Sequence, residues 1–407
     1  MNNCLKIGWA EVDITPNEKI GLAGQFYERI SEEVESPITV TALAVEKGDE
    51  QLIICSCDLA STSKRLLDAV RANVADKLPF STDKIIINAV HDHTSYDYSI
   101  KIDPIAKNLT VGGLQVLREL LPDDMEYVPL TASQDKMSPE KASELLIEKI
   151  SQAIISAWET RKDAYYANAF GRAAVGMCRR VTYDDGSAKM WGDTNLANFE
   201  ALEGGNDSGI ELIYTFDNEK RLTGIVANIA CPAQIVEHRS FISSDYWGKV
   251  KEYLRKRFGE SIMVLGLCSA AGDQCPRDMV RWVNPETPIN DPNINRDDYI
   301  ERRADPSMFD ISGLKVVGRR IANEIIAVFE ETELELKNDG ILIHNTDNIT
   351  IPLRRVTIEE HDSAVEKIND FIDKNRGKSV SFKDTAALHI YAGTIARYRL
   401  QQKLNSF

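Results

Sequence analysis

The chain has 407 residues, of which 43% are hydrophobic and 27% are charged, a composition typical of a folded globular protein rather than a disordered one. A net charge of −15 argues against nucleic acids and anionic membrane surfaces as partners. The sequence shows neither a bilayer-length apolar run nor a secretion signal, and its seven scattered cysteines are not a disulfide framework, so we expect a cytoplasmic protein without a membrane span.

The N-terminal region is predicted to form strands and turns. Alternating apolar residues predict a strand over residues 5–14. Gly21 and Gly24 follow, and glycines here indicate either a flexible turn or backbone that must approach another group closely. Residues 38–46 and 51–57 are two β-rich runs with a turn between them, which predicts a hairpin.

A histidine pair follows the next predicted strand, residues 84–90, whose β-branched residues indicate burial. A helix precedes this strand, so the segment fits a βαβ unit. Ligands usually lie at the carboxyl ends of strands in such sheets. If the strand continues, His91 and His93 point the same way and face one ion or one substrate. The alternative is that they are polar residues that cap a strand.

The central region continues the alternation of strands and helices. Residues 95–137 are irregular and are predicted to form a lid or substrate wall. Ser138-Pro139 is a helix start, because serine caps a helix and proline fits its first turn. After a strand at 164–176 comes Arg179, which is either solvated like most arginines or placed to hold an anionic substrate group or an oxyanion.

Residues with ligand-type side chains also follow the strands predicted at 209–216 and 224–229. Cys231 and His238 come shortly after the second of these strands. A helix at 246–258 and a strand at 262–267 lead into the small-residue turn Ala271–Cys275. That turn forms either an oxyanion pocket from converging N–H groups or a structural tight turn.

The C-terminal part is mainly helical. We expect a helix at 311–330, a strand at 340–351, a helix between Thr357 and Gly377, and a last helix at 384–402. No linker or internal repeat divides the chain. The sequence therefore predicts an α/β fold in which one large domain, 1–407, has a large mixed β-sheet with helices packed on the sheet faces.

Several short motifs, taken in order, resemble the N-terminal catalytic domain of the neutral/alkaline (non-lysosomal) ceramidase family. The motifs are Asp13-Ile14-Thr15-Pro16, the glycines to Gly24, His91-x-His93, Arg179, Ile242-Ser243-Ser244-Asp245-x-x-Gly248 and Ala271–Pro276. The resemblance implies a ceramidase-like fold and a zinc-dependent amidase that cleaves the N-acyl bond of ceramide-like lipids in sphingolipid metabolism.

The resemblance also implies roles for individual residues. His91 matches the first zinc histidine of the family, and His93 matches a histidine that faces the scissile carbonyl and its oxyanion. Gly24 matches a glycine whose backbone lines that pocket, and Arg179 matches an arginine of the active site.

The sequence departs from the family pattern at three places. The second zinc histidine falls on Cys231, whose thiolate is also a good zinc ligand, and His238 is the alternative ligand. Cys275 replaces a serine in the small-residue turn. A glutamate and a tyrosine ligand of the family lie beyond Phe407, so we expect that the C-terminal portion of the domain is missing.

Two other functions stay open. The first is hydrolysis of a small polar or sugar-derived amide or ester, favoured by the polar character of residues 95–137 and 277–309. The second is a non-catalytic binding or scaffold protein with a degraded site. Each of these interpretations involves a small-molecule ligand rather than nucleic acid. A missing terminal piece would leave an open sheet edge, which would favour a homo-oligomer.

Overall fold

The computed structural model describes residues 4–25, 29–99, 113–125, 136–280, 282–283, 303–304, 310–333, 335–352, 354–380 and 382–405. Contacts divide the chain into two compact units. The first comprises Met1–Gly24, Arg29–Ser99 and Lys136–Thr346, and the second comprises Gln25–Glu28, Ile100–Asp135 and Asp347–Phe407. The single catalytic domain expected over 1–407 stays a prediction.

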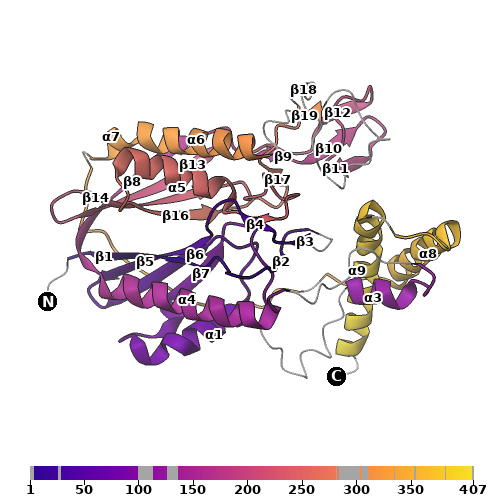
Figure 1. Cartoon of the computed structure of the whole chain (residues 1–407), viewed down its shortest axis with the longest axis horizontal. Helices are drawn as coiled ribbons and strands as arrows, with labels where there is room; N and C mark the ends of the chain where they lie inside the picture. The colour runs from indigo at the N-terminus through magenta and orange to yellow at the C-terminus, as the bar shows by residue number, and fades with distance from the viewer. Residues whose placement is uncertain are drawn as a thin grey trace. The chain divides into compact units, whose positions relative to one another are not determined.

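The first unit contains an eight-stranded mixed sheet, which confirms the predicted fold class (Figure 1). Neighbouring strands pair antiparallel except for two parallel pairs, β6–β7 and β14–β16. In spatial order the strands are β16 (Met263–Cys268), β14 (Leu222–Ile229), β13 (Gly209–Asp217), β8 (Lys162–Arg172), β1 (Lys6–Asp13), β5 (Thr39–Lys47), β6 (Glu50–Cys57) and β7 (Ile85–Ala89).

The sheet folds back on itself at its middle. Strands β1 and β8 pair through only two residues each, whereas β13 and β8 pair through nine. The two halves then pack face to face: the Trp9 indole N–H donates to Thr215 Oγ1 at 2.9 Å, and the Ser56 hydroxyl donates to the Gly266 carbonyl at 2.5 Å. A small apolar core that includes Leu43 fills the space between the halves.

Helices cover the two outer faces, which gives this unit four layers (Figure 1). Helices α1 (Lys64–Val74) and α4 (Pro139–Glu159) lie against the half that contains β1 and β5. Helices α5 (Asp245–Phe258) and α6 (Ile311–Ala327) pack on the other half over a large apolar core. The segments that follow β7 and β14 meet, because the Ala233 backbone N–H donates to the Val90 carbonyl oxygen at 3.3 Å.

Short elements complete the first unit. A three-stranded sheet follows residue 179, and β9 pairs with β17. The short strands are β2 (Gly21–Leu22), β3 (Arg29–Ile30), β4 (Glu33–Val34), β9 (Met177–Cys178), β10 (Arg180–Tyr183), β11 (Ala188–Met190), β12 (Phe199–Leu202), β15 (Phe241–Ile242), β17 (Gln274–Cys275), β18 (Trp282–Val283) and β19 (Arg303–Ala304). The short helices are η1 (Ala75–Lys77), η2 (Thr82–Lys84) and α7 (Phe329–Glu333).

The strand predicted at 340–351 is wrong. The described residues 340–352 contain no strand, and Ile341 and Ile343 are 88% and 70% exposed. The alternation of isoleucines is present, but a strand also needs a neighbour to accept its hydrogen bonds. Just before this segment, Lys337 forms an isolated bridge with Tyr166 that does not extend into a ladder.

The second unit is helical in its described part. It contains α3 (Gly113–Leu120), α8 (Ile358–Asn375) and α9 (Phe382–Asn405), packed around a core that includes Leu117 and Ile368. Both bonds of the predicted Thr357–Glu360 capping box are present, and Gly377 follows α8 in the left-handed region at φ 74°.

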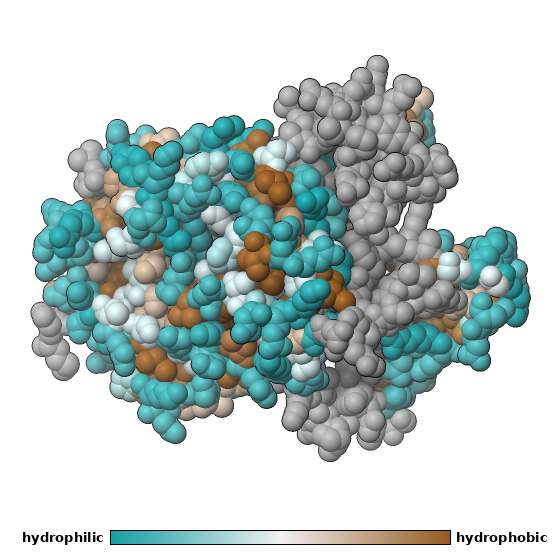
Figure 2. Space-filling view, viewed as in Figure 1, coloured by the Kyte–Doolittle hydropathy of each residue, from teal (hydrophilic) through white to brown (hydrophobic). Residues whose placement is uncertain are grey.

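The surface of the described residues is mainly hydrophilic on the face drawn in Figure 2, with hydrophobic residues scattered among polar ones. No helix among the described residues is long and apolar enough to cross a membrane. Most of residues 95–137, which were predicted to form a lid or substrate wall, and most of the polar stretch 277–309 lie outside the described residues.

Candidate active site

His91 and His93 meet ring to ring just beyond β7. Their Nε2 atoms are 3.2 Å apart, and the ring planes cross at 80°. The strand ends at Ala89, so the expected reason for this proximity, an alternating strand, is wrong. The chain turns instead, with His91 in the left-handed region at φ 61°. A non-glycine residue held there is a common sign of a functional constraint.

The outer nitrogen of each imidazole is held by an oxygen. His91 Nδ1 lies 2.6 Å from the Ala60 carbonyl oxygen, and His93 Nδ1 lies 2.9 Å from Glu237 Oε2. A carbonyl oxygen only accepts, so His91 Nδ1 carries a proton. Burial, followed by the neighbouring His93, lowers the pKa of His91 from its ordinary value, which favours the neutral ring with a lone pair on Nε2.

The segment after β14 wraps around His93. The Ala233 carbonyl accepts the His93 backbone N–H at 3.0 Å, and Glu237, four residues later, holds the ring. Between them, Gln234 is 2% exposed, and within the described part of the chain neither its amide oxygen nor its amide nitrogen has a hydrogen-bond partner. No sequence pattern singled out Glu237 or Gln234, although both follow a strand end.

Gly24 packs directly against His93. Gly24 has φ 93°, and a Cβ atom added to it would lie 2.5 Å from His93 Cγ. Nearby, Arg29 Nη2 donates to the His93 carbonyl oxygen at 2.6 Å and also to the Ala23 carbonyl oxygen. The close backbone approach considered for this glycine is therefore present, and the approach fixes the position of His93.

Arg179 and the turn Ala271–Cys275 lie together because β9 pairs with β17. The Arg179 backbone N–H donates to the Asp273 carbonyl at 2.8 Å, and Nη2 donates to the Gly272 carbonyl at 2.9 Å. Burial is the main cause that raises the pKa of Cys275, to about 12, so this thiol is not ionised at neutral pH. Cys275 therefore behaves as a small buried residue of the turn.

Trp191 lies near two arginines in this unit. The guanidinium carbons of Arg179 and Arg277 are 5.9 Å and 6.0 Å from the centre of the indole ring. Trp191 itself has φ 56°, an uncommon conformation for a bulky side chain. Arg179 also belongs to the charges that lower the pKa of His91, after burial and His93, so this polar wall lies within electrostatic reach of the histidine pair.

The two other residues predicted to bind metal are buried. Cys231 is fully buried in the large apolar core, with Sγ 3.6 Å from the Pro232 carbonyl oxygen, and burial raises the pKa of its thiol well above the ordinary value. His238 is 6% exposed. Among the residues that the structure describes, no group of three or more His, Cys, Asp or Glu side chains is arranged to hold a metal ion.

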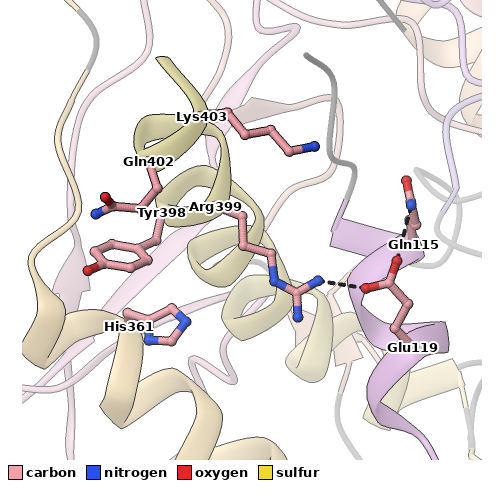
Figure 3. Close-up of a pocket in the computed structure, with 7 residues that line it drawn as sticks. All are labelled: Gln115, Glu119, His361, Tyr398, Arg399, Gln402 and Lys403. Carbon is pink, nitrogen blue, oxygen red and sulfur yellow. Dashed lines mark hydrogen bonds and ion pairs between the residues drawn. The ribbon is translucent and has the colours of Figure 1, made fainter. Parts of the chain in front are cut away.

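A separate pocket of about 450 Å³ lies in the second unit (Figure 3). His361, from α8, packs against Tyr398 of α9 with ring centres 4.5 Å apart and ring planes tilted by 37°. Arg399 of α9 forms an ion pair of 2.6 Å with Glu119 of α3. This pair ties two helices together, and the pocket contains none of the residues that the sequence predicted to be catalytic.

Comparisons with known proteins support the fold. No protein-family model and no curated protein matches the chain. Its structure is similar to that of neutral ceramidase from Pseudomonas aeruginosa, with a TM-score of 0.55 and 13% identity over 83% of this chain and 46% of that one. A structure described as ceramidase complexed with C2 gives a TM-score of 0.56 and 12% identity over 82% and 45%.

These neighbours show that the chain has a neutral ceramidase-like fold, as the sequence motifs predicted. The chain spans less than half the length of either solved structure. At this level of identity the likeness concerns the arrangement of strands and helices, and the chemistry must be argued from the site itself.

Proposed function

We propose that the chain is a zinc-dependent hydrolase that cleaves an amide (N-acyl) bond, with its centre at His91. One observation carries the proposal: the His91 Nδ1 atom is fixed on the Ala60 carbonyl, which leaves Nε2 directed at His93. Metal-binding histidines almost always donate their second ring N–H to such an oxygen. The ceramidase-like fold supports the choice of an amide as the bond that is cleaved.

Of the residues at this site, His91 has the chemistry of a zinc ligand, whereas no group of three or more His, Cys, Asp or Glu side chains is arranged to hold the ion in the part of the chain that the structure describes. The lowered pKa of His91, caused first by burial, favours the neutral imidazole that a metal requires. His91 would hold the ion, and the additional ligands proposed from the sequence are Cys231 or His238. When bound, zinc lowers the pKa of a coordinated water towards 7 and polarises a carbonyl group.

The protein's own groups would then handle the charge that develops on the substrate. Arg179 is anchored through Nη2 on the Gly272 carbonyl, and the residue is partly exposed. A guanidinium held in this way can donate to the oxyanion of a tetrahedral intermediate. Gly24 allows His93 to lie close to the backbone, which fixes the position of the imidazole.

The proposal includes two alternative classes of substrate. A ceramide-like lipid amide follows from the names of the structural neighbours. A small polar or sugar-derived amide or ester is favoured by the wall made of Arg179, Trp191 and Arg277, because guanidinium groups and an indole suit a polar or anionic group better than an acyl chain. The cytoplasmic location and a homo-oligomeric state stay predictions.

The test uses the metal-depleted protein and the same protein reloaded with zinc. We expect hydrolysis of either a fluorescent ceramide or N-acetylglucosamine only after reloading, and loss of both activity and zinc in His91→Ala. His361→Ala, a histidine of the second unit, is the matched control and should keep both. Wild-type protein that holds no zinc and hydrolyses neither compound would favour the scaffold alternative.

A further inference from the structure

We propose that the substrate carries an anionic group, a carboxylate or a phosphate, which Arg277 and Trp191 bind while Arg179 faces the scissile carbonyl. This inference rests on the proposed hydrolase function and deepens it, because it selects a small anionic substrate over a neutral lipid. Three features of the structure support it: the partners of Arg179, the way in which the indole of Trp191 is held, and the anchored segment that carries Arg277.

A site for anions is a local exception in this chain, whose net charge is −15. A protein with such an excess of carboxylates repels anionic ligands over most of its surface. Arginine can overcome this repulsion locally, since its planar guanidinium forms two parallel hydrogen bonds with a carboxylate or a phosphate. Arg179 and Arg277 place their guanidinium carbons 5.9 Å and 6.0 Å from the centre of one indole ring.

Arg179 is held by neutral oxygens rather than by a carboxylate in the described part of the chain. Its Nη2 donates to the Gly272 carbonyl at 2.9 Å, whereas the next residue, Arg180, forms an ion pair of 2.6 Å with Glu203. The Arg179 carbonyl in turn accepts the Trp191 backbone N–H at 2.8 Å. A guanidinium anchored on a neutral oxygen keeps its positive charge for a ligand.

Trp191 is held in an uncommon conformation that fixes its indole. Its φ is 56°, and backbone strain of this kind is concentrated at functional sites. The next residue, Gly192, lets the turn close tightly, since a Cβ atom there would lie 2.5 Å from the Tyr183 hydroxyl oxygen. The indole packs against a small core that includes Val181, Tyr183 and Cys275. A ring held in this way loses little freedom when a ligand binds.

Arg277 lies on a segment that is anchored on both sides. Cys275 precedes it in β17 and is fully buried, and Met279 follows it and is 4% exposed. The Met279 carbonyl accepts the Thr194 hydroxyl at 2.6 Å. Arg277 itself is only partly buried, so a ligand can reach its side chain while its backbone stays fixed.

The two arginines also act on groups of the candidate active site. Arg179 belongs to the charges that lower the pKa of His91, after burial and the neighbouring imidazole. Burial, the largest cause, raises the pKa of the Cys275 thiol, and the charges of Arg277 and Arg179 oppose it. Glu237 raises the pKa of both groups. Arg179 thus connects the arginine pair at the indole with the histidine pair, as a substrate bound by both would require.

Binding of two matched pairs of small amides tests the inference without relying on hydrolysis. The first pair is N-acetylglycine and its neutral amide, N-acetylglycinamide. The second pair is N-acetylglucosamine 6-phosphate and N-acetylglucosamine. Isothermal titration of the metal-depleted full chain measures each affinity, because an anion then cannot bind through a metal ion. We expect the anionic member of at least one pair to bind about 10- to 100-fold more tightly, the usual contribution of a charge-assisted hydrogen bond. This preference should weaken as salt is added.

Arg277→Gln should bind the two members of each pair with similar affinity, because a neutral side chain no longer attracts the anion. Arg257→Gln is the matched control and should keep the wild-type preference. Arg257 is exposed on α5 and also lies beside an aromatic ring, with its guanidinium carbon 5.1 Å from the centre of the Phe258 ring. Thermal melting checks that Arg277→Gln is folded, and Arg277→Lys, which keeps the charge, should keep part of the preference.

The outcomes separate the anionic subsite from the proposed hydrolase. Equal affinities within both pairs, an unchanged preference in Arg277→Gln, or a wild-type preference that survives high salt overturns the subsite and leaves the hydrolase to its own assay. A preference that depends on Arg277, without hydrolysis of any amide after zinc is restored, supports the subsite and contradicts the hydrolase. A preference within one pair alone supports the subsite and identifies its group as the carboxylate or the phosphate.

Discussion

Gly24 and His93 are in such close contact that no side chain fits between them: a Cβ atom on Gly24 would lie 2.5 Å from His93 Cγ and 2.7 Å from His93 Cα. Because Gly24 has no side chain, its backbone packs directly against His93 and limits the movement of the imidazole ring. His93 Nδ1 also forms a hydrogen bond with Glu237 Oε2. A methyl group added at position 24 must therefore break one of the contacts that fix the imidazole.

Gly24→Ala is expected to reduce amide hydrolysis by about 100-fold, the usual cost of misplacing a group in an active site by about an ångström. Gly186→Ala is the matched control, because Gly186 also has a positive φ of 77° but no described atom lies within 4 Å of its added Cβ. Both variants carry the backbone strain, and only Gly24→Ala displaces a ring. Equal activities in steady-state assays would contradict the prediction.

Arg179→Ala is expected to lower kcat by about 10²- to 10³-fold with little change in thermal stability, because one oxyanion donor is lost. Arg180→Ala should stay within about twofold of the wild type, since the Arg180 side chain is exposed and forms a surface ion pair with Glu203. Similar losses in the two variants would indicate a general effect on the small sheet rather than a role for Arg179.

Gln234→Met is expected to raise the melting temperature, because each of the two polar atoms of Gln234 that lack a partner among the described residues costs about 1–3 kcal/mol when buried. Gln274→Met is the control. Gln274 is equally buried but donates to the Gly205 carbonyl at 3.0 Å and accepts from Asn206 at 2.8 Å, so its replacement should destabilise the protein. A lower melting temperature for Gln234→Met in calorimetry would sink the prediction.

Asp245 should make stability depend on pH. Burial raises the pKa of this carboxyl from 3.8 to about 7, against backbone N–H donors that lower it. Between these values the folded protein keeps a proton that the unfolded chain releases, so stability falls as the pH rises from about 4 to about 7. An asparagine side chain at this position cannot ionise, so Asp245→Asn removes this dependence.

The free-energy difference between the wild type and Asp245→Asn should therefore shift in favour of the asparagine variant as the pH rises through this range. The shift should be on the order of 4 kcal/mol at most, from a pKa change of about three units. Urea unfolding of both proteins at the two ends of the range measures it. A constant difference would show that Asp245 ionises normally.

Local sequence patterns predicted the helices and strands well, because these elements depend on residues that are close to one another in sequence. The capping box at Thr357 and the strand before His91 are both present within a residue or two of their expected bounds. The strand expected at 340–351 failed for a non-local reason: alternation specifies two faces, but pairing requires an adjacent strand that the sequence cannot identify.

The candidate site could be predicted only in part, because several of its contacts join residues that are far apart in sequence. His91 and His93 were recognisable as polar residues after a strand, but their partners were not. Ala60 contributes only a carbonyl, which has no sequence signal, and Glu237 is 144 residues from His93 in sequence. The contact between Glu237 and His93 exists because the sheet folds at the short β1–β8 junction, and no local pattern marked that fold.

The second unit is built from three separate stretches of chain, and α3 lies in a different stretch from α8 and α9. A gene shortened after codon 346 would remove both later helices but still encode α3, whose Val116 and Leu117 are fully buried against them. The shortened product would carry an apolar helix with no partner. Truncation from the C-terminus alone therefore exposes an apolar surface on α3. Removal of the whole second unit needs two further deletions, of Gln25–Glu28 and Ile100–Asp135, which both lie between stretches of the first unit.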